Sequence, residues 1–100
     1  MINGYEIFWT DHALDELEKT IEYLEENWEI SDLVNFATKL ENTISLISQN
    51  PDLFPSSGIK KGIHRAIVAK HNSLYYRLNQ DTIEIISFFS HRQSKRKRKL

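Results

Sequence analysis

The sequence from residue 63 to residue 89 reads IHRAIVAKHNSLYYRLNQDTIEIISFF. Asparagine tolerates the positive φ that a tight turn needs, so His71-Asn72 suits a two-residue hairpin turn. Strands joined by such short turns are antiparallel neighbours, and this stretch therefore predicts a three-strand meander. Its runs of β-branched, aromatic and other apolar residues predict strands at 63–70, 73–79 and 82–89.

The turns also decide which side chains face the core, because side chains alternate between the two faces of a strand. If His71-Asn72 and Gln80-Asp81 are both two-residue turns, one face of the meander is apolar and is expected to cover the helices. That face would comprise Ile63, Ile67, Ala69, Leu74, Tyr76, Leu78, Ile83, Ile85 and Phe89. The opposite, open face would show His64, Lys70, Tyr75, Arg77 and Glu84.

Two helical stripes precede the meander, because apolar residues recur there at spacings of three and four. Thr10 can cap the first helix and Ser31 with Asp32 can cap the second, while Pro51 ends it. Since the connection between the helices is short, we expect them to lie antiparallel. The first stripe comprises Leu14, Leu17, Ile21, Leu24 and Trp28, and the second comprises Leu33, Phe36, Ala37, Leu40, Ile44 and Ile47.

The order of the elements predicts the fold class. The run YEIFW at residues 5–9 is aromatic and β-branched and suits a first strand. Residues 51–62, with two prolines and two glycines, are expected to form an exposed loop. The whole predicts an α+β fold: an N-terminal strand, an antiparallel helix hairpin and then a three-strand antiparallel meander, with both helices packed on one face of the sheet.

Charge divides the chain at the same place. Residues 1–53 hold 12 acids and 2 bases, a net charge of 2 − 12 = −10, whereas residues 54–100 hold 11 bases and 2 acids, a net charge of 11 − 2 = +9. A basic half built on a sheet can meet phosphate or an acidic protein while the acidic helices stay in water.

Length and composition bound the remaining possibilities. With 100 residues and 40% apolar content, we expect a single domain at 1–93 and a basic C-terminal tail at 94–100. No run approaches the roughly 20 apolar residues that span a bilayer, and the N-terminus lacks the pattern of a signal peptide. We therefore expect a cytoplasmic protein without membrane contacts. The absence of cysteine excludes disulfides and thiolate metal sites.

The motifs of common enzyme classes are missing. The chain has no Gly-rich phosphate loop, no HExxH motif and no nucleophile elbow, so we expect no metal site and no cofactor. What remains is a set of histidine and arginine residues on or beside the predicted sheet: His64, Arg65, His71, Arg77, His91 and Arg92.

Five phrases, each on the expected element and in the expected order, resemble the RelE/ParE superfamily of bacterial type II toxins. The similarity runs from about Tyr5 to Gln93 and implies a growth-arresting toxin that forms a hetero-oligomer with a cognate antitoxin protein. The phrases are NPDLFP at 50–55, GIHRAIV at 62–68, HNSLYYRL at 71–78, IEII at 83–86 and SHRQ at 90–93.

Members of this superfamily have one of two different activities. RelE-like and YoeB-like members cut messenger RNA on the ribosome, whereas ParE-like members poison DNA gyrase and are not nucleases. The nucleases carry an arginine just before the middle-strand L-V-Y, and here that position is Ser73. YoeB-like members end in His-Tyr, but here His91 is followed by Arg92. Arg92 could match a RelE-like arginine, although the later RelE-like tyrosine is missing.

The Tyr76-Arg77 pair and the histidine-containing phrase after the last strand look more like ParE. The resemblance thus implies a ParE-like inhibitor of DNA gyrase that is not an enzyme. One alternative is a RelE-like, metal-independent endoribonuclease that acts on messenger RNA at the ribosome. A second alternative is a non-toxic basic module that binds nucleic acid.

Several basic residues are candidates for contact with the target. In the nuclease alternative His91, Arg92 and Arg65 would be catalytic, because imidazole exchanges protons near neutral pH and guanidinium binds phosphate. Each candidate also has a structural interpretation. Arg77 can pair with Glu84 across the strands, Arg65 can extend over the core, and the tail can be a solvated charge run. The candidates for target or phosphate binding are Arg65, Arg77, His91, Arg92, Lys95, Arg96, Lys97 and Arg98.

The other two histidines are expected to have no special role. His64 and His71 belong to different predicted elements, so they do not suggest a metal site. We expect both to be ordinary surface residues.

Overall fold

The computed structural model describes residues 4–27, 29–58, 60–69 and 72–90. The observed order of a strand, two helices and a three-strand meander confirms the predicted α+β fold. The elements are β1 (Glu6–Trp9), α1 (Asp11–Asn27), α2 (Ile30–Gln49), β2 (Ile63–Ala69), β3 (Asn72–Asn79) and β4 (Thr82–Ser90). Within the described part of the chain, neither helix is long and apolar enough to cross a membrane.

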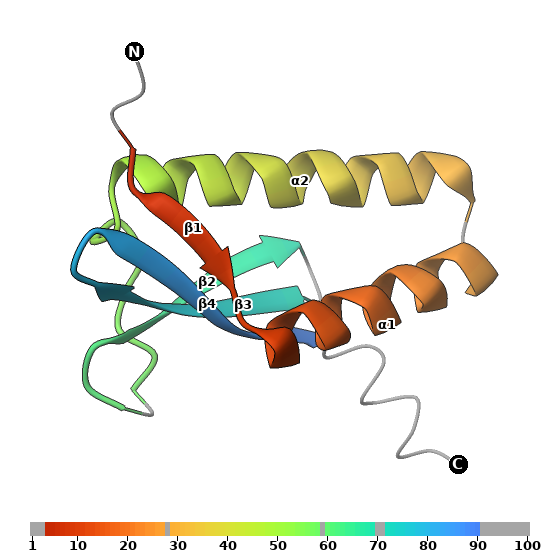
Figure 1. The fold of residues 1–100 in the computed structure, drawn as a ribbon. Helices are drawn as coiled ribbons and strands as arrows, with labels where there is room; N and C mark the ends of the chain where they lie inside the picture. Colours follow the sequence, from red (N-terminus) through yellow and green to blue (C-terminus); the bar gives the residue numbers. More distant parts are fainter. Residues whose placement is uncertain (1–3, 28, 59, 70–71, 91–100) are drawn as a thin grey trace.

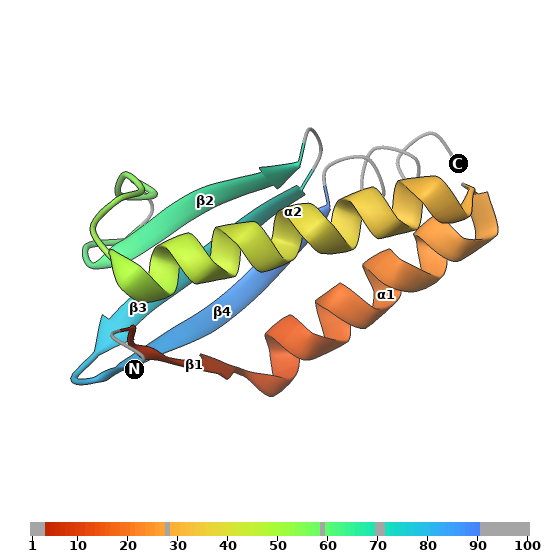
Figure 2. The ribbon, with the colours of Figure 1, turned by 90° about the horizontal axis from the view of Figure 1, so that it is seen from above.

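The strands form one sheet in the order β1-β4-β3-β2. The meander is antiparallel, whereas β1 pairs parallel with β4 and forms one edge of the sheet. Both helices lie on the same side of the sheet and run antiparallel to each other (Figure 1). Seen from above, they meet at their connection and diverge toward the start of α1, where β1 runs between them (Figure 2).

Side-chain caps define where the helices begin. The Thr10 hydroxyl accepts a hydrogen bond from the Ala13 amide at 3.2 Å, which confirms the predicted cap of α1. The predicted start of α2 at Ser31 is wrong, because the N-cap is Glu29. Asp32 lies three residues inside the helix, where its carboxylate accepts a hydrogen bond from the Glu29 amide at 3.2 Å.

The predicted apolar stripe of α1 coincides only in part with the face of the helix that is buried. Ala13 and Thr20 are fully buried, whereas Leu14 is 47% exposed and Leu17 is half-buried. The reason is the place of α1 beside the edge of the sheet. One side of the helix packs on β4, and Leu14 and Leu17 line a hollow between the two helices. Trp28, the last residue of the predicted stripe, lies outside the described residues.

The register between β2 and β3 differs from the prediction. Ile67 pairs with Ser73, whereas a two-residue turn at His71-Asn72 would pair it with Tyr76. A shift of three residues is odd, so it turns every side chain of β2 to the other face of the sheet. Ala66 and Val68 are therefore buried under the helices, and Ile67 is 61% exposed.

The same shift exchanges the expected positions of two candidate residues. Arg65 lies on the open face, where it is the partner of Tyr75 in the neighbouring strand. His64 faces the core side beside Tyr76, so its predicted position among the ordinary surface residues is wrong.

The register between β3 and β4 agrees with the prediction near the turn and departs from it farther along. Asn79 pairs with Thr82, which confirms the two-residue turn, but an irregularity follows in which Tyr75 pairs with Ser87 and Tyr76 with Ile85. Because β4 contains one additional residue there, its alternation reverses. As a result Phe88 is buried in place of the predicted Phe89, and its ring packs edge-on against Phe36 at a centroid distance of 5.8 Å.

Tyr76 joins the long loop to the sheet. Its hydroxyl, fully buried, donates a hydrogen bond to the Pro51 carbonyl at 2.7 Å. The His64 ring stacks on the Tyr76 ring at 5.2 Å, and its Nδ1 lies 2.8 Å from the Phe54 carbonyl oxygen. A carbonyl oxygen can only accept, so Nδ1 carries the proton. The predicted exposed loop is thus anchored at its start, where Pro51 is buried.

Burial raises the pKa of Tyr76 to about 12, from an ordinary value of 10.0. An unfolded chain loses this proton first, so the folded protein binds more protons between pH 10 and 12 and becomes less stable as the pH rises through that window. Two pKa units correspond to about 2 to 3 kcal/mol of the free energy of unfolding.

Tyr76→Phe should remove this pH dependence and cost about 1 to 3 kcal/mol below pH 9, because the Pro51 carbonyl loses its partner. Urea unfolding of both proteins across that pH range measures the difference. Tyr75→Phe removes the same group from the open face and serves as the control. If the free energy of unfolding depends on pH equally in the wild type and in Tyr76→Phe, the raised pKa is wrongly assigned to Tyr76.

Candidate functional site

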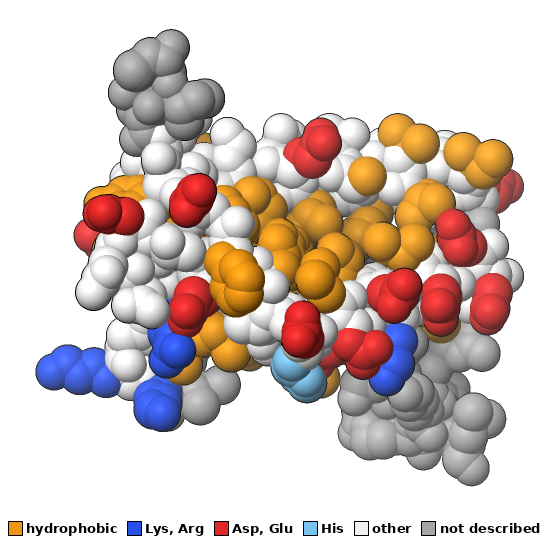
Figure 3. Space-filling view, in the orientation of Figure 1, with side chains coloured by type: hydrophobic (Ala, Val, Ile, Leu, Met, Phe, Trp, Pro, Cys, Tyr) orange, Lys and Arg blue, Asp and Glu red, His pale blue; other side chains and the backbone are white. Residues whose placement is uncertain are grey.

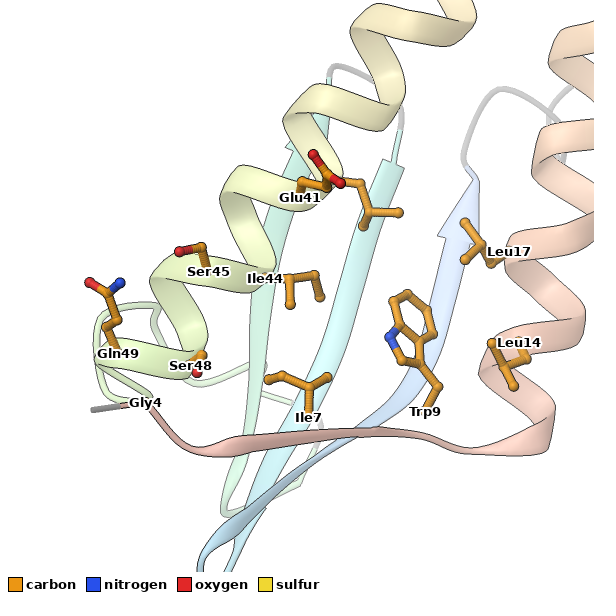
Figure 4. A pocket seen from close by; sticks show the side chains of 11 residues that line it. Gly4, Ile7, Trp9, Leu14, Leu17, Glu41, Ile44, Ser45, Ser48 and Gln49 are labelled. Atoms are coloured by element: carbon orange, nitrogen blue, oxygen red, sulfur yellow. The ribbon is translucent and has the colours of Figure 1, made fainter. Parts of the chain in front are cut away.

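A groove lies between α1 and α2, with β1 as its floor. Its volume is about 980 Å³. In the close view, Ile7 and Trp9 of β1 lie between Leu14 and Leu17 of α1 on one side and Ile44 of α2 on the other (Figure 4). We call this the helix groove, and it is lined by Gly4, Ile7, Trp9, Leu14, Leu17, Leu40, Glu41, Ile44, Ser45, Ser48 and Gln49.

Hydrogen bonds at both ends of β1 fix the floor of the helix groove. At the start, the Tyr5 amide donates to the Ser48 carbonyl and the Ser48 hydroxyl donates to the Tyr5 carbonyl, each at 2.8 Å. A Cβ on Gly4 would lie 2.2 Å from the Ser48 hydroxyl oxygen, so only glycine permits this close approach. At the other end, the Thr10 amide and hydroxyl both donate to the Ile85 carbonyl, at 3.1 and 2.9 Å.

The surface around the helix groove combines apolar side chains with a border of carboxylates. Apolar side chains gather between the two helices, and acidic side chains border them along α1 and on α2 (Figure 3). On the α2 wall the acid is Glu41. On α1 a smaller neighbouring hollow of about 530 Å³ is lined by Asp11, Leu14, Asp15, Leu17, Glu18 and Ile21.

The open face of the sheet carries the two described arginines among the candidate residues. Arg65 Nε donates to the Ser73 hydroxyl oxygen at 3.2 Å, and Ser73 is only 1% exposed. Arg77 Nε donates to Glu84 Oε1 at 2.7 Å, which confirms the predicted cross-strand ion pair. Asn79 donates to the other carboxylate oxygen of Glu84 at 3.3 Å.

The pKa of Glu84 is lowered, first by the hydrogen bond from Arg77 and then by the one from Asn79. The carboxylate is therefore charged at neutral pH, and the charge of Arg77 is compensated. Two exposed apolar side chains, Ile67 and Phe89, flank Ser73 on the same face.

The structure brings only part of the predicted site together. Arg65 and Arg77 share the open face on adjacent strands, while His64 lies on the other side of the sheet. Among the described residues, no group of three or more histidines and acids could hold a metal ion. The candidates His91, Arg92, Lys95, Arg96, Lys97 and Arg98 lie outside the described residues, as do Lys70, His71 and the predicted tail at 94–100.

Sequence reasoning missed the helix groove. Leu14 and Leu17 were predicted only as members of the apolar stripe of the first helix, because their spacing is that of any such stripe. A local signal existed in Gly4, a glycine directly before a short strand, although it does not reveal that Ser48 lies opposite. The groove results from the divergence of the two helices, which no local pattern encodes.

Comparisons with known proteins agree with this fold. A family model described as "ParE toxin of type II toxin-antitoxin system, parDE" matches residues 7–95. The sequence has no match among curated proteins.

Three solved structures illustrate the likeness. A chromosomal ParDE toxin-antitoxin system from P. aeruginosa superimposes with a TM-score of 0.72 at 11% identity, covering 86% of this chain and 95% of that one. The E. coli DinJ-YafQ toxin-antitoxin complex gives 0.61 at 15% identity, covering 91% and 97%. A YoeB dimer from Staphylococcus aureus gives 0.61 at 16% identity, covering 89% and 99%. At such identities the likeness shows the fold alone.

Proposed function

Because the chain belongs to the ParE toxin family of type II toxin-antitoxin systems, we propose that it inhibits DNA gyrase and that a cognate antitoxin neutralises it by binding in the helix groove. The solved structures with the same fold include toxin-antitoxin complexes. The proposal that this toxin acts on gyrase, and is not a ribonuclease, has support from the chemistry of the open face.

A ribonuclease that works without metal needs a general base to take the proton of the ribose 2′-hydroxyl. Over the described residues of β2, β3 and β4, the open face carries no histidine, and its one carboxylate is Glu84. Glu84 is bonded to Arg77 and Asn79, and its lowered pKa makes it a weak base. This lack of a base is the observation that favours gyrase inhibition over cleavage.

Arg65 and Arg77 then have a binding role in the proposed function. Both arginines lie on the open face, and Arg65 is bonded to Ser73, which pairs with the exposed residue Ile67. A mixed surface of this kind can contact a protein, and arginine and apolar groups are common at the centres of protein interfaces. We expect the basic residues at 92–99 to add contacts with gyrase or its bound DNA.

The helix groove has the properties of a site for an amphipathic helix. An α-helix with its side chains is about 10 Å across and presents apolar residues along one stripe. The groove offers apolar walls from both helices, and its floor holds Ile7 and Trp9. An antitoxin helix would bury this surface, which the free toxin leaves partly open at Leu14.

The alternative of a RelE-like endoribonuclease depends on His91 and Arg92, because the described open face does not supply a base. We expect the purified protein to inhibit DNA supercoiling by gyrase and to leave ribosome-bound messenger RNA intact. A supercoiling assay and a primer-extension map of the messenger measure the two activities side by side. Codon-positioned cleavage that disappears in His91→Ala or Arg92→Ala would overturn the gyrase assignment.

A further inference from the structure

Arg65 is held by a buried hydroxyl group of the neighbouring strand. Its Nε donates a hydrogen bond to the Ser73 hydroxyl oxygen at 3.2 Å. Ser73 is 1% exposed and is therefore held in place by the sheet around it, whereas Arg65 is half-buried. In the register of β2 and β3, Arg65 lies opposite Tyr75, and Ser73 lies opposite Ile67. The hydrogen bond thus runs diagonally between the two strands and fixes the inner end of the guanidinium group.

The contact with Ser73 leaves the outer end of the guanidinium group for a ligand. Arginine carries its N–H donors in a rigid planar fork, on Nε and on the two terminal nitrogens Nη1 and Nη2. Because Nε is engaged, a ligand of Arg65 has to approach the two terminal nitrogens end-on. Within the described part of the chain, these nitrogens have no hydrogen-bond or ion-pair partner. An oxyanion such as a carboxylate or a phosphate matches this fork with two parallel hydrogen bonds.

The charges of the open face favour a carboxylate over a phosphate chain. Arg77 donates to Glu84, so its charge is compensated on the sheet itself. Among the described residues of β2, β3 and β4, the open face therefore carries one uncompensated positive charge, at Arg65. A nucleic acid backbone is bound by several bases together, and Glu84 would repel it. A single carboxylate of a protein suits this face better, because Tyr75 and the exposed Ile67 beside Arg65 are typical of protein interfaces.

We propose that Ser73 is a positioning residue, which directs the terminal nitrogens of Arg65 toward an acidic side chain of the target protein. This inference rests on the proposed function, in which the open face contacts gyrase, and it names the chemistry of that contact: an aspartate or glutamate carboxylate of gyrase. Ser73 is too deeply buried to touch the target itself. Its effect on inhibition passes through Arg65.

Four variants test the contact through their affinity for gyrase. Arg65→Lys keeps the charge but loses the fork, and we expect a loss of about tenfold or more. Ser73→Ala removes the acceptor of Nε and should cost about threefold to tenfold. Ser73→Thr keeps a hydroxyl group at this place and should retain most of the affinity. Ser87→Ala is the matched control, because it removes a hydroxyl that donates to Glu16 at 2.8 Å and lies two strands away from Arg65.

A double-mutant cycle distinguishes positioning from a general effect on the fold. In an Arg65→Ala background, Ser73→Ala should cause no further loss of affinity, because the group that it positions is absent. A loss of the same size with and without Arg65, at equal folded fractions, would show a merely structural role for Ser73 and overturn the proposal. Isothermal titration with gyrase in the absence of DNA measures the affinities. If Arg65→Lys weakens binding only when DNA is present, the oxyanion is a phosphate and the carboxylate assignment is wrong.

A measurement without gyrase separates this inference from the proposed function. The Nε–H proton of arginine gives its own NMR signal, and a hydrogen bond slows its exchange with water. In the wild type and in Ser87→Ala, this proton of Arg65 should exchange about fivefold slower than in Ser73→Ala. Equal exchange rates would overturn the positioning role even if gyrase is inhibited. If the rates differ as expected but the wild type does not bind gyrase, Ser73 does position Arg65 and the proposed target is wrong.

Discussion

Cells that produce the Leu14→Arg variant are expected to stop growing even when the antitoxin is co-expressed. Leu14 is 47% exposed in the free protein, so a long charged side chain can extend into water without disturbing the fold. In the complex it would lie on the wall of the occupied helix groove. Because Leu14 is already about half buried, the variant then loses apolar burial worth about 1 to 1.5 kcal/mol. It must also desolvate a guanidinium group, at a cost of several kcal/mol.

Together these costs should weaken antitoxin binding by about 100-fold to 1000-fold or more, since each 1.4 kcal/mol is about a factor of ten. Isothermal titration measures the affinity, and growth of co-expressing cells measures neutralisation. Leu46→Arg is the matched control, because Leu46 is 48% exposed on α2 and does not line the groove. Gyrase inhibition by both variants should equal that of the wild type.

The acids bordering the groove refine this expectation. Asp11, Asp15 and Glu18 lie on the α1 side and Glu41 on the α2 side, so the antitoxin helix should carry basic residues beside its apolar stripe. If the antitoxin neutralises the Leu14→Arg variant and the wild type equally well, its binding site must lie elsewhere on the toxin.

Deletion of residues 94–100 should give the second large effect, and it should depend on salt. The segment contains five consecutive bases and a single apolar residue, so it has too little apolar surface to contribute to the stability of the domain. The melting temperature should stay nearly unchanged. At low salt the deletion should strongly weaken binding to the complex of gyrase with DNA, because each phosphate contact of the full-length tail releases counterions.

A tail that touches about three to five phosphates gives a slope of roughly −3 to −4 for log affinity against log salt, and this lowers affinity about 100-fold between about 50 and 200 mM salt. For the truncated protein, the plot of log affinity against log salt should be nearly flat. Lys60→Ser with Lys61→Ser removes two bases from the exposed loop and is the control. Equal inhibition by truncated and full-length protein at every salt concentration would assign target binding wholly to the sheet.

Several features of this protein follow from the sequence alone. The apolar spacings and the Thr10 cap fixed the order and type of the elements, because helix and strand periodicity are local properties. The two-residue turn at Gln80-Asp81 correctly placed Arg77 opposite Glu84, since a short turn sets the register beside it. Phrases spread along the whole chain indicated the superfamily, and the ParE family model confirms it over residues 7–95.

Other features were decided only by the packing of distant parts. The register of β2 shifted by three residues relative to the turn prediction, which placed Ala66 and Val68 under the helices and moved Arg65 to the open face. A turn sequence indicates a local conformation but not which face of the strand meets α2. The face is chosen by the burial that the whole core gains, and a one-residue change reverses it.

The helix groove and the contact of Glu16 with β4 were likewise decided only by the packing of distant parts of the chain. The groove exists because β1 is bonded to Ser48 at one end and to β4 at the other, which keeps α1 and α2 apart. The sequence predicts Glu16 to be one more acid on a solvated helix face. The approach of α1 to Phe88, 72 residues away, gives Glu16 its partner on β4, and contacts at such separation depend on the closure of the whole chain.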